Sequence, residues 1–123
     1  PFARARLHVG IVRVEGAKMA KSAGNLVFIA DLLQRYPATA LRLMLLDHPW
    51  DAEWDYSPER PEAAAAHLDR LHTAAGRTGT DPAAEEAAMR ALLDDLDVRT
   101  ALAIAEEAGG RAARTVLHTL ALT

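Results

Sequence analysis

The residues of this chain best suited to chemistry are two lysines three positions apart. Lys18 and Lys21 lie in a short segment that Ser22, Gly24 and Asn25 close, which is typical of a loop. Lysine carries a compact positive charge on a flexible stem, so two lysines can follow the charge that develops as pyrophosphate leaves a nucleotide. The alternative interpretation is a solvated basic loop, because short motifs of this kind often occur without function.

The segments around the lysines predict how they are held. Residues 7–14 are rich in apolar and β-branched side chains, which is typical of a buried strand. Residues 15–16 indicate a turn, within a mobile loop expected over residues 15–25. The pattern further predicts a short helix, a buried helix and an irregular acidic stretch, over residues 31–35, 38–46 and 47–56.

Four helices are expected in the rest of the chain. Ser57-Pro58 and Asp81-Pro82 are favourable helix starts, because each places an N-cap side chain before a proline at the first helical position. Asp97 is expected to cap a third helix, which Gly109-Gly110 ends. A last helix is expected over residues 111–122. These helices predict a C-terminal bundle.

A single strand cannot form a sheet, so residues 7–14 need a partner. Three partners are open: a nucleotide-binding half outside this chain, a second copy, or a hairpin with residues near 26–28. The expected fold class is mostly α, with a short β-strand and loop followed by a helical bundle. The expected boundary divides residues 1–56 from residues 57–123.

Lys18-Met19-Ala20-Lys21-Ser22 resembles the KMSKS signature of class I aminoacyl-tRNA synthetases, with alanine where serine is usual. The flanking segments resemble the cysteinyl type of that family and follow in the same order. These segments are residues 1–4, 7–10, 12–16, 25–29, 31–33, 40–46 and 94–97.

The resemblance implies a fold and a site. The strand and loop would be the remnant of a Rossmann-like catalytic domain, and the helices would form a stem-contact region and a bundle. Lys18 and Lys21 would be catalytic, stabilising the β- and γ-phosphates of ATP while the carboxylate of cysteine attacks the α-phosphorus. ATP would carry Mg²⁺. The implied ATP-binding set is Lys18, Met19, Lys21, Ser22, His8 and Gly10.

Composition limits the alternatives. The 123 residues suffice for about one domain, and their net charge of −3 argues against a broad nucleic-acid surface. The chain has no cysteine, so it has neither a disulfide nor a thiolate metal site. No apolar run approaches the roughly 20 residues that span a bilayer, and we expect a cytoplasmic protein without a membrane partner.

The family's HIGH motif and its zinc-binding cysteines are not in this sequence. We therefore expect a C-terminal fragment of the enzyme, inactive in isolation, with zinc only in the missing N-terminal part. Pairing with a nucleotide-binding half is then expected as well.

The histidines are weaker candidates. His8 precedes Val9-Gly10 but lacks the second histidine of HIGH, so a place at the sheet end or beside adenosine is expected. His48 lies among acidic residues that could bind a divalent cation, although a solvated acidic loop is favoured. His67 and His72 are five apart, which does not place them on one helix face, so no metal site is predicted.

The favoured function is the C-terminal part of a cysteinyl-tRNA synthetase-like enzyme, which forms cysteinyl-adenylate from cysteine and ATP and transfers the cysteinyl group to tRNA. A close alternative is an ATP-dependent cysteine ligase with a small amino-sugar acceptor, as in the mycothiol pathway, and the acidic net charge favours it. A third possibility is a non-catalytic helical module that docks on a separate nucleotide-binding half.

Overall fold

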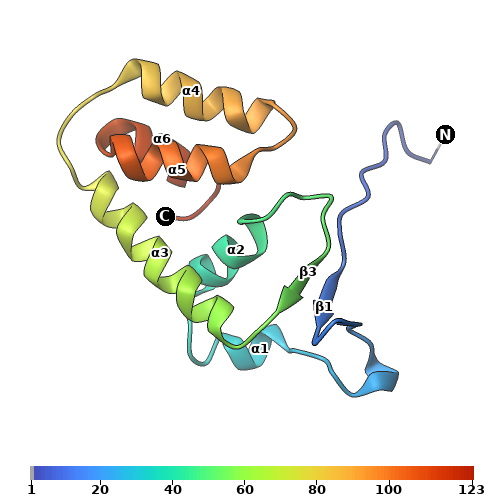
Figure 1. Ribbon diagram of the computed structural model, residues 1–123. Helices are drawn as coiled ribbons and strands as arrows, with labels where there is room; N and C mark the ends of the chain where they lie inside the picture. Colours follow the sequence, from blue (N-terminus) through green and yellow to red (C-terminus); the bar gives the residue numbers. More distant parts are fainter. Residues whose placement is uncertain (1) are drawn as a thin grey trace.

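Helices make up most of the fold, and a small sheet carries its N-terminal part (Figure 1). The computed structural model describes residues 2–123, so Pro1, in the first segment that resembles the family, lies outside the described residues. The strands are β1 (Val12–Val14), β2 (Ala17–Lys18) and β3 (Trp54–Tyr56). The helices are α1 (Ile29–Leu32), α2 (Ala38–Leu46), α3 (Glu59–Ala75), α4 (Pro82–Leu93), α5 (Val98–Ala108) and α6 (Gly110–Thr119), with a 3₁₀ turn, η1 (Lys21–Ala23). This arrangement confirms the mostly α fold class with a short strand portion.

The sheet has the order β2-β1-β3, with β1 antiparallel to β2 and parallel to β3. Of the three partners left open for residues 7–14, the hairpin with residues near 26–28 does not form, because the described strands paired with β1 are β2 and β3. The irregular stretch expected over 47–56 was also wrong at its end, since Trp54–Tyr56 forms β3. The regular strand expected over 7–14 is confined to Val12–Val14.

The parallel pairing continues beyond the short strands. The Gly10 N–H donates to the Trp50 carbonyl at 2.9 Å, and the Trp54 N–H donates to the Ile11 carbonyl at 3.2 Å. Gly10 also comes so close to the neighbouring backbone that a Cβ atom there would lie 1.8 Å from the Ala52 carbonyl oxygen. Only glycine allows this approach, so Gly10 determines how closely the two segments pair.

The turn expected at residues 15–16 is confirmed. Glu15 and Gly16 have φ values of 50° and 76°, and two positive φ angles in succession are typical of tight hairpin turns. The mobile loop expected over 15–25 needs correction, because β2 and η1 occupy part of it. Asp55 fixes the turn by accepting a hydrogen bond from the Gly16 N–H at 2.9 Å.

Helices α3 to α6 pack as a bundle around a shared apolar core. Asp81 and Asp97 cap α4 and α5 as expected, accepting hydrogen bonds from the N–H groups of the third residues beyond them. The expected Ser57 cap is absent, because α3 starts without a side-chain capping bond. The last helix ends at Thr119 rather than 122, since Ala121 has a φ of 55° and turns Leu122 back into the core.

Helix α2 joins the two parts of the molecule. Its buried Ala40 and Leu43 belong to the core of the bundle, whereas Leu41 and Met44 pack with Leu32 in a smaller cluster. Tyr56 of β3 lies against this smaller cluster, together with Val27, Tyr36 and Trp54. The sheet is therefore attached to the bundle through α2. Between Phe2 and Thr123, no helix is both long and apolar enough to cross a membrane.

We expect Gly10→Ala to lower the free energy of unfolding by about 1–3 kcal/mol, because the new methyl group overlaps the backbone at Ala52. Urea unfolding followed by circular dichroism measures this. Gly76→Ala is the matched control, since the nearest atom to its Cβ, the Thr73 carbonyl oxygen, is 3.4 Å away. Equal stability of the two variants would contradict the close approach at Gly10.

Candidate functional site

The two lysines lie in a hydrogen-bonded turn at the edge of the molecule. Lys18 ends β2 and is paired with Arg13 across the hairpin, while Lys21 opens η1. Both lysines are exposed. Figure 1 shows this segment on the side of the molecule away from α4. Two mobile ammonium groups at an open edge can approach a phosphate group of another molecule.

Asn25 holds the backbone between the lysines. Its side-chain Oδ1 accepts a hydrogen bond from the Ala20 N–H at 2.9 Å, and its Nδ2 donates to the Lys18 carbonyl at 3.2 Å. Asn25 was expected only as one of the residues that close the lysine segment, without this role. The signal was available, because asparagine commonly bonds to nearby backbone in turns.

The other residues of the motif shape the turn. Gly24 ends η1 with a φ of 66°, a left-handed conformation, and its N–H donates to the Lys21 carbonyl. Met19 and Ala20 are half-buried, whereas Ser22 is exposed. The two lysines are thus exposed to solvent, whereas Met19 and Ala20, which lie between them, are half-buried.

His8 and Gly10 lie in the segment before β1 rather than in the lysine turn. His8 is exposed on the extended segment that leads into β1, and Gly10 packs against residues 50–52, on the β3 side. The lysines follow from β2, on the opposite side of β1. The described contacts of Gly10 are with the segment that leads into β3 rather than with the lysine turn.

Acidic residues before and within β3 fasten the hairpin. Glu53 forms an ion pair with Arg13 at 2.7 Å, and the hydrogen bond from Arg13 holds the pKa of the Glu53 carboxyl below its usual range. With Asp55 bonded to Gly16, both carboxylates secure β1 and its turn. These residues were expected only as part of an acidic loop, because their partners lie about 40 positions away.

His48 and the aromatic residues act as anchors. The His48 ring stacks on Trp54, with centroids 4.2 Å apart, and the Arg60 guanidinium lies 5.3 Å from the centre of the Trp54 ring. Burial lowers the pKa of His48. Trp50 Nε1 donates to the Asp95 carbonyl at 2.9 Å. Within residues 2–123, no three acidic or histidine side chains are grouped to hold a metal ion.

His67 and His72 have separate partners. His67 lies between Asp47 and Glu106, whereas His72 Nε2 lies 2.8 Å from the Leu122 carbonyl oxygen. These contacts fasten α3 to other segments.

Residues 1–66, which are more than half of the chain, match the model of a known protein family. This region matches the catalytic domain of class I tRNA synthetases of the C type. The chain belongs to this family. The match includes the lysine turn, the whole sheet, α2 and the first part of α3.

Curated relatives of this class I synthetase chain are ligases with two kinds of acceptor. An L-cysteine:1D-myo-inositol 2-amino-2-deoxy-alpha-D-glucopyranoside ligase from Thermobispora bispora is 44% identical over 85% of this chain and 26% of its own length. The enzyme of the same name from Kineococcus radiotolerans is 40% identical over 97% of this chain and 29% of its own. A cysteine–tRNA ligase from Rhodospirillum rubrum is 42% identical over 83% of this chain and 23% of its own. The class I synthetase chain thus spans about a quarter of the length of these relatives.

Asn25→Ala is expected to make the lysine turn open more often while the rest of the chain stays folded. The part-buried hydrogen bond from the Ala20 N–H to Asn25 contributes about 1 kcal/mol, so hydrogen exchange at the Ala20 amide should quicken about fivefold. Ser22→Ala in the same turn is the control. Unchanged exchange at Ala20 in Asn25→Ala would contradict the role of this side chain.

Proposed function

We propose that this chain provides the pyrophosphate-binding turn of an enzyme that activates cysteine with ATP and transfers the cysteinyl group to an acceptor. Membership of the class I synthetase family carries the proposal. The exposed lysines in a turn braced by Asn25 support the choice of site. The relatives supply the chemistry, since they are named as ligases that use cysteine.

In the proposed reaction, a carboxylate oxygen of cysteine attacks the α-phosphorus of ATP and the bond to pyrophosphate breaks. Negative charge then increases on the departing β- and γ-phosphates. Lys18 and Lys21 would meet this charge most strongly in the transition state, which lowers the barrier. The acceptor afterwards attacks the cysteinyl carbonyl and releases AMP.

The remaining candidates have smaller roles in this proposal. Ser22 and Met19 shape or anchor the turn, while His8 lies on the exposed segment before β1 and would reach the nucleotide only from that side. Mg²⁺ would arrive on the phosphates of ATP. The nearby carboxylates of Glu53 and Asp55 are engaged by Arg13 and the Gly16 N–H, which fits an ion held by the nucleotide.

A small amino sugar is the acceptor that the observations favour. The ligases from Thermobispora bispora and Kineococcus radiotolerans are named for such an acceptor, and the second aligns with 97% of this chain. The net charge of −3 supports the same choice, since tRNA binding generally requires an excess of positive charge. Transfer to tRNA is the second candidate, favoured by the 42% identity to the Rhodospirillum rubrum ligase.

We expect Lys21→Ala to reduce cysteine-dependent exchange of pyrophosphate into ATP about 10²-fold to 10³-fold, because a charge aimed at the leaving group is lost. The assay uses this chain with the rest of the catalytic domain, in one polypeptide or as a separate partner. Arg6→Ala removes an exposed cation outside the turn and serves as the control. Full activity of Lys21→Ala would contradict the proposed site.

The acceptor is tested with radiolabelled cysteine in the same preparation. Ligation to glucosaminyl-inositol without charging of tRNA would support the favoured acceptor, and charging of tRNA alone would support the second candidate. Complex formation with a nucleotide-binding half without any gain in exchange would instead support a non-catalytic docking module.

A further inference from the structure

Lys18 belongs to a row of charged residues that runs across the three strands of the small sheet. Arg13 on the central strand β1 is paired with Lys18 of β2 on one side and with Asp55 of β3 on the other. Residues paired in this way lie on the same face of a sheet. Glu53 reaches this face as well, because its Oε2 accepts a hydrogen bond from Arg13 Nε at 2.7 Å. Two cations and two carboxylates therefore share the face that carries Lys18.

The contact between Arg13 and Glu53 removes a conflict from this row. Arg13 and Lys18 are like charges directly opposite each other, an arrangement that destabilises strand pairing. Glu53 Oε2 lies 2.7 Å from both Nε and Nη2 of Arg13, and so neutralises its charge from the β3 side. Lys18 can then stay in register on β2, the outer strand of the sheet.

The turn between β1 and β2 is bound at both polar groups of Gly16. Its N–H donates to Asp55 Oδ1 at 2.9 Å, and its carbonyl oxygen accepts from Arg13 Nη1 at 3.3 Å. Glu15, the other residue of the turn, has a positive φ that residues other than glycine rarely adopt, so the turn needs support from its surroundings. Lys18 follows two residues after Gly16. Asp55 thus holds the turn that leads directly to this lysine.

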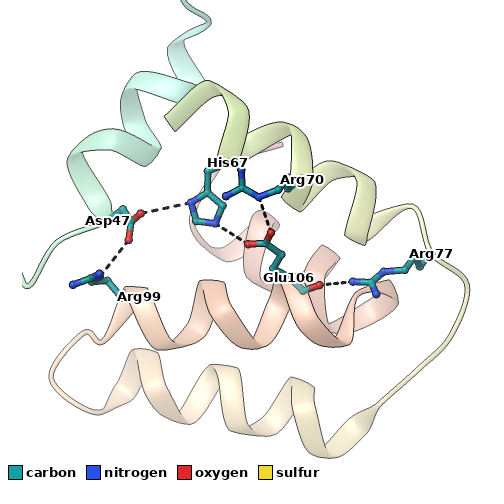
Figure 2. A network of polar contacts seen from close by, with 6 residues as sticks. All are labelled: Asp47, His67, Arg70, Arg77, Arg99 and Glu106. Atoms are coloured by element: carbon teal, nitrogen blue, oxygen red, sulfur yellow. Dashed lines mark hydrogen bonds and ion pairs between the residues drawn. The ribbon is translucent and has the colours of Figure 1, made fainter. Parts of the chain in front are cut away.

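The connection between α2 and α3 that supplies both carboxylates is itself attached to the bundle. Figure 2 shows Asp47, where this connection begins, between His67 of α3 and Arg99 of α5. Closer to the sheet, Trp54 and Tyr56 pack against the smaller apolar cluster. The carboxylates that contact the hairpin therefore come from a segment that is held at both ends.

We propose that Asp55 is a positioning residue for Lys18, acting through the Gly16 amide and supported by the ion pair of Arg13 with Glu53. This role rests on the proposed function, because it concerns the placement of a lysine that meets the departing pyrophosphate. It requires no contact between Asp55 and ATP. A charge already in place where negative charge develops needs no reorganisation during the reaction, so a displaced lysine lowers the rate.

Hydrogen exchange in the 123-residue chain tests the contact itself. Asp55→Ala removes the acceptor of the Gly16 N–H, so exchange at the Gly16 amide should quicken about fivefold. Asp55→Asn keeps an oxygen that can accept this bond and should change the rate by less than about twofold. Far-ultraviolet circular dichroism checks that the variants are folded. Equal exchange at Gly16 in the parent chain and in Asp55→Ala would overturn the proposal.

Exchange of pyrophosphate into ATP, in this chain together with the rest of the catalytic domain, tests the role. We expect Asp55→Ala to lower kcat about tenfold and to change the KM for ATP by less than about twofold, because the lysine acts mainly in the transition state. Asp55→Asn should restore most of the activity. Asp51→Ala removes an exposed carboxylate from the same connection and serves as the control.

A Lys18→Ala background separates positioning from a loss of folded enzyme. If Asp55 acts through Lys18, adding Asp55→Ala to Lys18→Ala should lower the activity further by less than about twofold. A further loss of about tenfold would overturn the proposal, because a loss of folded enzyme lowers both backgrounds alike.

The proposed function and the role of Asp55 can fail separately. Full activity of Asp55→Ala alongside a strong loss in Lys21→Ala would overturn only the role of Asp55. Full activity of both variants would contradict the proposed function and this role together.

Discussion

The parallel pairing of β1 with β3 is the contact on which the position of the lysine turn depends. Strands of three residues provide few hydrogen bonds, so the contact relies on what surrounds it. Gly10 brings the preceding backbone against residues 50–52, and Arg13 and Gly16 are fastened to Glu53 and Asp55. A short sheet is thereby fixed strongly enough to carry a turn with two exposed charges.

Packing on α2 connects the sheet to the helices. β3 leads directly into α3, and Tyr56 packs on the small cluster that contains Leu41 and Met44 of α2. The other face of α2 contributes Ala40 and Leu43 to the core of the bundle. Because packed side chains transmit strain, a displacement of the bundle also displaces the base of the lysine turn.

Features that depend on neighbouring residues could be predicted from the sequence. The caps at Asp81 and Asp97, the turn at Glu15-Gly16 and the lysine motif are examples, since each rests on contacts within a few positions. β3 was not predicted, because its alternation covers only three residues and its partner strand is about 40 positions away. The contacts of His67 were missed for a similar reason, since Asp47 and Glu106 come together only when three helices pack.

Both tryptophans of the chain, Trp50 and Trp54, lie in the connection between α2 and α3. One donates a hydrogen bond to Asp95, and the other is stacked under His48. Neither tryptophan lies within the bundle helices, whose core is aliphatic over the described residues. The tryptophan fluorescence of this chain therefore originates at the joint between its two parts. Tryptophan emission reports a change at that joint, whereas far-ultraviolet ellipticity reports mainly the helices. Separation of the sheet from the bundle and unfolding of the bundle therefore give different optical signals in one sample.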